Sequence, residues 1–322
     1  MRNILFRADS SSTIGTGHIM RDLVLAEQFS GDNIIFATQD LLGNINHKIE
    51  EKKYTIEILY SNNLEELDTL IKQLKIDMIV IDHYGIDYNF EKQLKDHNPS
   101  LIIMSLDDTY ERHYCDILLN HNISADSKKY TDLVPKNCEL RCGAPYTLLR
   151  DEFLNIKKAK RVIEDKQPLT LFIAMGGADH SNKNIEILKV INMFKDLCAI
   201  VVTTQANQHL DELEQYVKQF NNIAVHINTT EIATLMNQSD LAIITPSVTV
   251  NEVINMGLPF IAIQTATNQV EIANFLILND FQVIKEFDSH KLEKAISHLL
   301  NPSHYQDNIK MIEKILEDRV AS

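Results

Sequence analysis

The chain has 322 residues, of which 44% are apolar and 24% charged, and its formal net charge is −14 at pH 7. This length predicts about two domains, and the apolar fraction is ample for buried cores, which excludes a disordered chain. The negative charge disfavours nucleic acid and anionic membranes as partners, and at first sight it also disfavours a polyanionic small ligand.

The four cysteines are too few and too scattered for a disulfide framework, and no second pair of ligands follows them at zinc spacing. No apolar run approaches the ~20 residues of a membrane span. The apolar stretch at the N-terminus is too brief for a signal peptide. We therefore expect a cytoplasmic, monomeric protein.

Short β-branched runs alternate with helical stretches in the first half of the chain, which is the pattern of βαβ units on a parallel sheet. Continuous apolar runs such as 78–81 are typical of strands buried on both faces. The pattern predicts strands at 4–6, 34–37, 56–59, 78–81, 101–104 and 117–119, with helices at 20–29 and 64–74 among them.

A polar, lysine-rich stretch at 155–168 interrupts the alternation and is interpreted as a linking helix with a connector. The pattern then restarts, so we predict two Rossmann-like doubly wound α/β domains, 1–155 and 156–322, with a cleft between them. A final helix over 307–319 would be placed to pack back on the first domain. The other expected elements are strands at 169–174, 199–202, 223–226, 241–244 and 260–263, and helices at 184–194, 210–220, 230–236, 249–256 and 269–278.

The loop after the first predicted strand combines polar residues with glycines. Gly15 and Gly17 let the backbone approach a ligand, and the helix that follows offers unpaired N–H groups to an anion. A Gly-x-Gly pair without a third glycine is only a weak dinucleotide signal. His18 is either a helix-terminal residue bonded to nearby backbone or a general base whose ring Asp9 orients. Arg7 and Asp9 would hold the loop and tune His18.

Two loops of the second half carry similar chemistry. Gly176 and Gly177 follow a buried strand and suit close approach to a phosphate, although an ordinary βα turn explains them equally well. Residues 247–249 offer hydroxyl and N–H groups at a predicted helix N-terminus. Glu252 is placed to accept hydrogen bonds from ribose hydroxyls, or is only a favourable partner for the helix dipole.

Two shorter polar segments also follow predicted strands, one at 82–85 and the other at Asn268 and Gln269. Five polar loops thus fall at the carboxyl ends of strands, where open α/β folds bind ligands, and this predicts an active site between the domains. The chain has no Gly-x-Ser-x-Gly elbow, no Walker loop and no metal-ligand spacing. Covalent acyl chemistry, P-loop ATP hydrolysis and a metal site are therefore disfavoured.

Several segments resemble the UDP-sugar hydrolases of pseudaminic acid biosynthesis, in order along nearly the whole chain. That family is similar to the UDP-N-acetylglucosamine glycosyltransferases of peptidoglycan synthesis, and the resemblance implies their two-domain GT-B fold. The segments are FRADSS with IGTGHIMR at 6–21, IDHYG at 81–85, CGAPYTLLRDEF at 142–153, MGGAD at 175–179, VNE at 250–252 and NQ at 268–269.

The resemblance implies that water attacks the anomeric carbon of a UDP-linked diacetamido-trideoxyhexose and releases UDP with inversion, without metal or cofactor. It makes His18 the general base. The implied contacts to substrate come from Gly15, Gly17, Asp9, Tyr84, Gly176, Gly177, Ser247, Val248, Thr249, Glu252, Asn268 and Gln269, with Glu252 on the ribose.

The alternatives are a GT-B glycosyltransferase that moves the sugar to an acceptor, and a nucleotide-sugar-binding module without catalysis. A UDP-sugar is compatible with a net charge of −14, because backbone N–H groups at helix N-termini can bind its diphosphate.

Overall fold

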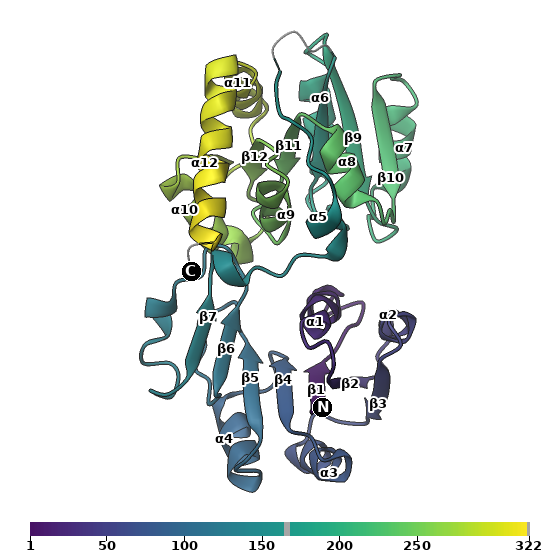
Figure 1. The fold of residues 1–322 in the computed structure, drawn as a ribbon. Coiled ribbons are helices and arrows are strands. Elements are labelled where there is room, and N and C mark those ends of the chain that lie inside the picture. Colours follow the sequence, from purple (N-terminus) through teal and green to yellow (C-terminus); the bar gives the residue numbers. More distant parts are fainter. Residues whose placement is uncertain (164–167, 321–322) are drawn as a thin grey trace. The chain divides into compact units, whose positions relative to one another are not determined.

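The computed structural model describes residues 1–163 and 168–320, in which the chain divides into unit 1, Met1–Leu148, and unit 2, from Leu149 onward (Figure 1). The sequence placed the boundary after residue 155. Helix α5 (Asp151–Asn155) instead belongs to unit 2, because the side chain of Asn255 donates to the carbonyl of Phe153 at 2.9 Å.

Unit 1 is built on a seven-stranded sheet in the order β3-β2-β1-β4-β5-β6-β7. Every pairing is parallel, and Ala8 at the end of β1 lies opposite Asp82 at the end of β4. The strand order reverses between β1 and β4, which is where doubly wound sheets open a crevice for ligands. The strands are β1 (Asn3–Ala8), β2 (Asn33–Gln39), β3 (Thr55–Leu59), β4 (Met78–Asp82), β5 (Ile102–Leu106), β6 (Ile117–Asn120) and β7 (Glu139–Cys142).

Helices cover both faces of this sheet, because successive residues of a strand point to opposite sides. Ile4 and Phe6 of β1 pack in one core with helices α1 (Gly17–Glu27) and α2 (Asn46–Glu51). Leu5 packs in the other core with helices α3 (Leu64–Leu74) and α4 (Tyr88–His97). Two 3-10 turns, η1 (Ser127–Tyr130) and η2 (Ala144–Tyr146), flank β7.

Unit 2 repeats the plan with six strands in the order β10-β9-β8-β11-β12-β13, and its order reverses between β8 and β11. The last helix, α12, packs against α11 and α9. The strands are β8 (Leu169–Ala174), β9 (Leu197–Thr203), β10 (Ile223–Ile227), β11 (Leu241–Ile244), β12 (Phe260–Ile263) and β13 (Gln282–Ile284). The other helices are α6 (Lys183–Ile191), α7 (Leu210–Val217), α8 (Ile232–Gln238), α9 (Thr249–Asn255), η3 (Thr267–Gln269), α10 (Val270–Leu278), α11 (Ser289–Leu299) and α12 (Pro302–Val320).

The predicted doubly wound fold is confirmed, and each predicted strand is present with ends shifted by no more than a few residues. The prediction of a linking helix over 155–168 is wrong for the part that the structure describes, because residues 156–163 are not helical. Residues 164–167 lie outside the described residues. The side chain of Asn237 accepts from the N–H of Ala159 at 2.8 Å, and Arg161 donates to carbonyls at the end of α8. This segment is thus held by α8 instead of by helical bonds of its own.

Packing of α12 on the first domain stays a prediction. Among the described helices, none combines the length and the apolar character that a membrane crossing requires.

Candidate active site

The loop between β1 and α1 is folded back on itself. Ser11 and Gly15 exchange two backbone hydrogen bonds of 3.2 and 2.9 Å, and Gly15 has φ +88°, a conformation that favours glycine. Helix α1 then begins at Gly17 with no side-chain cap and no acidic residue in its first turn. The loop therefore delivers His18 to the first turn of a helix whose N–H groups are not capped by a side chain.

His18 contacts a carboxylate from the neighbouring strand. Its Nδ1 lies 2.7 Å from Oδ1 of Asp82, and its side chain is only 9% exposed. Burial favours the protonated acid, but Arg21 and His18 outweigh this effect and hold the pKa of Asp82 below its usual range. Asp82 is therefore an ionised acceptor, so in the neutral imidazole the proton lies on Nδ1 and the free lone pair on Nε2. That is the tautomer a general base needs.

Arg21 binds the same carboxylate from one helical turn further along α1. Its Nε and Nη2 donate to the two oxygens of Asp82, both at 2.5 Å, and its Nη1 donates to Asp108 at 3.1 Å. Nη2 also lies 3.1 Å from Nδ1 of His18. Since both nitrogens donate to Oδ1 of Asp82, that short distance reflects a shared acceptor and not a bond between them.

Tyr84 lies beside this group and is 69% exposed. Its hydroxyl donates to Asp108 at 2.9 Å, and its ring meets the His18 ring edge-on at 4.9 Å between centroids. Loss of water around the hydroxyl and the neighbouring carboxylate raise the pKa of Tyr84 to about 12. Tyr84 is thus a neutral, accessible side chain next to His18, as a sugar contact requires.

Asp9 does not orient His18, so that expectation is wrong. Its oxygens accept from both terminal nitrogens of Arg7 at 2.7 and 2.8 Å, from the N–H of Gln39 and from Nε2 of His83. Arg7 is fully buried and needs a carboxylate beside it, which fixes the direction of Asp9. Asp9 and Arg7 hold the loop, as predicted, while a substrate contact by Asp9 stays a prediction.

Sequence reasoning missed the partners of His18. Asp82 was considered only as part of a polar segment at a strand end, and no role was assigned to Asp108, which contacts Arg21 and Tyr84 and not His18 itself. A stronger signal was available: residues three apart on a helix share a face, which places Arg21 beside His18. The ends of β1 and β4 also flank the reversal in strand order, which brings Asp82 to the same place.

In unit 2, the predicted glycine loop follows β8. Gly176 has φ +81°, and both glycines are exposed. The carbonyl of Gly177 accepts from the hydroxyls of Thr203 and Thr204 at 3.0 and 2.9 Å and from the N–H of Thr204 at 2.9 Å. Three donors on one carbonyl fix the peptide plane at the point where a phosphate would approach.

The loop after β11 lies next to the glycine loop, because the N–H of Thr245 donates to the carbonyl of Ala174 at the end of β8. The hydroxyls of Thr245 and Ser247 are 3.1 Å apart, and Val248 is 43% exposed. Helix α9 begins at Thr249 with no side-chain cap. Ser247, Val248 and Thr249 therefore lie together at the carboxyl edge of the sheet.

Glu252 is held by an arginine. Nη2 of Arg150 contacts Oε1 of Glu252 at 2.9 Å, and Nη1 contacts Glu152 at 2.6 Å. Burial raises the pKa of Glu252, and Arg150 opposes that effect only in part. The carboxylate thus has a fixed direction one turn into α9.

Asn268 and Gln269 differ in how accessible their side chains are to a ligand. Asn268 is exposed in η3. The side-chain oxygen of Gln269 accepts from the N–H groups of Thr265 and Ala266 at 2.8 and 3.3 Å, so it caps its own loop. Asn268 is thus accessible for the predicted contact, and substrate contacts by Asn268 and Gln269 both stay predictions.

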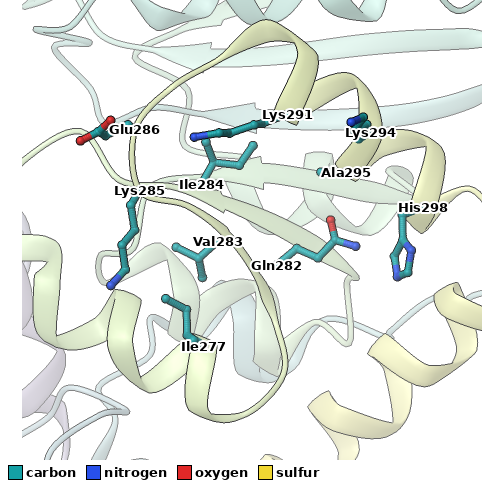
Figure 2. Close-up of a pocket in the computed structure, with 10 residues that line it drawn as sticks. All are labelled: Ile277, Gln282, Val283, Ile284, Lys285, Glu286, Lys291, Lys294, Ala295 and His298. Carbon is teal, nitrogen blue, oxygen red and sulfur yellow. The ribbon is translucent and has the colours of Figure 1, made fainter.

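A hollow of about 730 Å³ lies elsewhere, beside the edge strand of unit 2 (Figure 2). None of the predicted site residues lines it, and its cationic side chains come from α11 and from the segment between β13 and α11. Its lining is Ile277, Gln282, Val283, Ile284, Lys285, Glu286, Lys291, Lys294, Ala295 and His298. Within the described residues, no group of three or more His, Cys, Asp or Glu side chains is arranged to hold a metal ion.

The fold is that of the GT-B glycosyltransferases. MurG of Acinetobacter baumannii matches with a TM-score of 0.69 and 13% identity, over 98% of this chain and 95% of that one. Phytolacca americana UGT2, complexed with UDP-2-fluoroglucose and pterostilbene, matches with a TM-score of 0.67 and 8% identity, over 98% and 94%. Models of protein families give no match.

The sequence comparison is more specific. Over 280 residues, the chain is 40% identical to UDP-2,4-diacetamido-2,4,6-trideoxy-beta-L-altropyranose hydrolase of Campylobacter jejuni, covering 87% of this chain and 98% of that protein. The chain belongs to the family of that hydrolase, which confirms the resemblance found in its motifs.

Proposed function

We propose that this chain hydrolyses UDP-2,4-diacetamido-2,4,6-trideoxy-beta-L-altropyranose in pseudaminic acid biosynthesis. Water attacks the anomeric carbon, the bond from that carbon to the UDP oxygen breaks, and the configuration inverts. The observation that carries the proposal is the 2.7 Å contact between Nδ1 of His18 and Asp82, which leaves Nε2 free to act as a base. Membership of the hydrolase family supports the substrate.

In this mechanism, Nε2 of His18 takes a proton from water while the water oxygen bonds to the anomeric carbon. The positive charge that forms on the imidazole is stabilised by Asp82, which is only 1% exposed and so interacts strongly. Base catalysis of this kind contributes about 10²- to 10⁴-fold to the rate.

The departing UDP carries the negative charge that develops in the transition state. We assign its diphosphate to the edge of unit 2, where Gly176, Gly177, Ser247 and Thr249 present backbone N–H and hydroxyl groups. Because such donors stabilise the leaving oxygen, the mechanism needs no protein acid. Tyr84 and Asn268 contact the sugar or diphosphate, and neither a metal nor a cofactor takes part.

The decisive experiment follows the reaction by NMR with candidate UDP-sugars in ¹⁸O-labelled water. We expect the label at the anomeric carbon of an inverted free sugar, and an unchanged rate in EDTA. Label in UDP would show attack at phosphorus, and strict dependence on an added acceptor would show a glycosyltransferase. Binding of UDP-sugar without turnover would show a binding module.

Substitution of His18 tests the base. In His18→Asn we expect hydrolysis to fall by ~10²-fold or more, as for loss of a general base, while UDP still binds. Turnover is measured as UDP release, and binding by calorimetry.

His290→Asn is the matched control, because His290 is an exposed histidine that also lies beside a carboxylate, that of Glu293. Its turnover should equal that of the natural chain. Unchanged turnover in His18→Asn would remove His18 from the mechanism.

A further inference from the structure

We propose that Arg21 is a positioning residue that keeps His18 neutral, and therefore basic, by sharing the Asp82 carboxylate with it. The inference rests on the proposed function, because it concerns the proton that His18 takes from water. It adds a residue to which neither the family resemblance nor the comparisons give a role.

The geometry places three charged or polar groups on one carboxylate. Arg21 donates to both oxygens of Asp82, and Nδ1 of His18 donates to the oxygen that Nη2 of Arg21 also contacts. The side chains of Arg21, Asp82 and His18 are 14%, 1% and 9% exposed, so water screens them weakly. His18 thus meets a carboxylate that already has its own counter-ion.

The charges around His18 can be counted over every element that contributes to the group. Helix α1 contributes Arg21, β4 contributes Asp82, and the segment after β5 contributes Asp108, which give a net charge of −1. The loop after β4 contributes Tyr84, which stays neutral because its pKa is raised to about 12.

Two further groups in the same neighbourhood are neutral and buried. Burial and the nearby Asp82 carboxylate raise the pKa of Asp22 on α1, which favours its uncharged form. Burial and Arg21 lower the pKa of His121, after β6, to about 4, so it carries no charge at neutral pH. The net charge of −1 is therefore set by Arg21 and the two ionised carboxylates.

This charge decides whether His18 is free to accept a proton. With Arg21 present, protonation of His18 changes the net charge of this cluster of side chains from −1 to 0. Without Arg21, two carboxylates with no counter-ion would stabilise the imidazolium, and an opposite charge this close shifts a titration by about 1–3 pH units. Removal of Arg21 would therefore favour the protonated form of His18, which cannot take a proton from water.

Arg21 also connects the base to the exposed tyrosine. Its Nη1 donates to Asp108, whose other oxygen accepts from the hydroxyl of Tyr84 at 2.9 Å. The same guanidinium thereby fixes His18 through Asp82 and Tyr84 through Asp108.

The test is the pH dependence of kcat/KM for Arg21→Met, Arg21→Lys and Asp108→Asn. We expect the acidic limb of Arg21→Met to move up by about one pH unit or more, with activity recovering at higher pH. Arg21→Lys keeps the charge and should restore most of the natural profile. Asp108→Asn removes a carboxylate, so its acidic limb should move in the opposite direction, to lower pH.

Arg141→Met is the control, since it breaks an ion pair between Arg141 and Glu139 that is 31% and 55% exposed. Thermal unfolding is measured for every variant. If Arg21 has only a structural role, kcat/KM of Arg21→Met falls by the same factor at every pH and its acidic limb does not move. That result would overturn the inference. If Arg21→Met does not fold, Asp108→Asn decides: an acidic limb at lower pH supports the inference, and an unmoved limb overturns it.

The two proposals fail in different ways. If the natural chain releases no UDP from any UDP-sugar, the proposed function is wrong. If it hydrolyses the substrate and His18→Asn is inactive, but the acidic limbs coincide in all Arg21 and Asp108 variants, only the inference on Arg21 is wrong.

Discussion

Glu252 and Arg150 form an ion pair within unit 2, with 2.9 Å between Nη2 and Oε1. An ionised carboxylate with a fixed direction discriminates between ligands with and without a hydroxyl group, because each hydrogen bond to a charged group contributes about 1.5–3 kcal/mol. The pair therefore suits recognition of ribose hydroxyls at the proposed nucleotide edge.

We expect Glu252→Gln to bind UDP ~10-fold or more weakly, in line with the loss of a charge-assisted hydrogen bond. The natural chain should prefer UDP over 2′-deoxy-UDP or 3′-deoxy-UDP, and the variant should lose this preference. Calorimetric titration with the three nucleotides measures both effects.

Glu212→Gln serves as the control, because Glu212 is a carboxylate of unit 2 that is 67% exposed on α7. An equal loss of affinity for UDP and both deoxynucleotides in Glu252→Gln would show that Glu252 contacts no ribose hydroxyl.

At the residue scale, the sequence predicts His18 as a general base but pairs it with the wrong carboxylate. The predicted partner, Asp9, is nine positions away, whereas Asp82 is 64 positions away. Proximity along the chain favoured the wrong carboxylate, because the side chain of Asp9 is required by the buried Arg7. Long-range contacts of this kind depend on strand order, which the alternation of strands and helices does not specify.

At the element scale, the glycine loop after β8 is held against the end of β9. A Cβ on Gly177 would lie 2.8 Å from Cγ2 and 3.1 Å from Oγ1 of Thr204. Such a contact forces one partner to move, and the partner also donates to the carbonyl of Gly177. The absence of a side chain at position 177 therefore matters for the conformation of the loop as well as for the approach of a ligand.

We expect Gly177→Ala to weaken UDP binding by ~10-fold, the order of a 1–2 kcal/mol rearrangement. Adding Thr204→Ala should recover part of the loss, because it removes the methyl and hydroxyl groups that a Cβ would meet. Affinities of the natural chain, both single variants and the double variant form a double-mutant cycle.

Thr204→Ala alone is the control in this cycle, since it loses the hydroxyl donor without adding a Cβ. Additive losses in the double variant would show that the contact between positions 177 and 204 does not shape the loop.

The predictable elements were those with continuous apolar runs. Strands such as Met78–Asp82 are buried at every position, so their sequence is distinctive. Strands β7 and β13 were missed because they are short edge strands with mostly half-exposed residues, such as Glu139–Cys142. The polar stretch after Asn155 looked helical because it is rich in lysine, but it lacks the apolar face that would pack a helix.

At the scale of the whole molecule, the two units differ in how they respond to acid. In unit 1, charged and hydrogen-bonding neighbours overcome burial and lower the pKa of Asp9, Asp82 and Asp107. In unit 2, burial raises the pKa of Asp179 and Glu252. The first set stabilises the folded state when ionised. For the second set, burial makes ionisation less favourable in the folded state than in the unfolded one, so protonation by acid does not remove stability from these groups.

We expect unit 1 to unfold first as the pH is lowered. Lowered carboxyl pKa values contribute stability that is present above the unfolded values near 4 and is lost as pH falls towards the folded ones. In unit 1 only Asp22, whose pKa is raised, opposes this trend among the buried aspartates named here. Pulsed hydrogen exchange with mass spectrometry, after incubation between pH 7 and 2, measures the units separately.

Incubation at alkaline pH, up to about pH 11, extends the same experiment and tests the contribution of His113 to the stability of unit 1. Burial lowers the pKa of His113, but Asp107 and Glu91 outweigh burial and raise it to about 10. A raised histidine pKa contributes stability that is fully present below about 6.5 and is lost as pH rises through about 10. Unit 1 should therefore lose stability first at alkaline pH as well. Earlier hydrogen exchange in unit 2 than in unit 1, at both acidic and alkaline pH, would contradict these expectations.

The Arg7–Asp9 pair has a consequence for how this sequence can evolve. Arg7 is fully buried and Asp9 is 1% exposed, so loss of either one leaves the other charge buried without its ion-pair partner, which costs about 3–5 kcal/mol. A lineage that replaces one must pass through a poorly folded intermediate before it replaces the other. The exposed residues Thr13 and Ile14, a few positions further on, carry no such penalty. Descendants of this chain should therefore inherit Arg-x-Asp as one unit and diverge at the tip of the same loop.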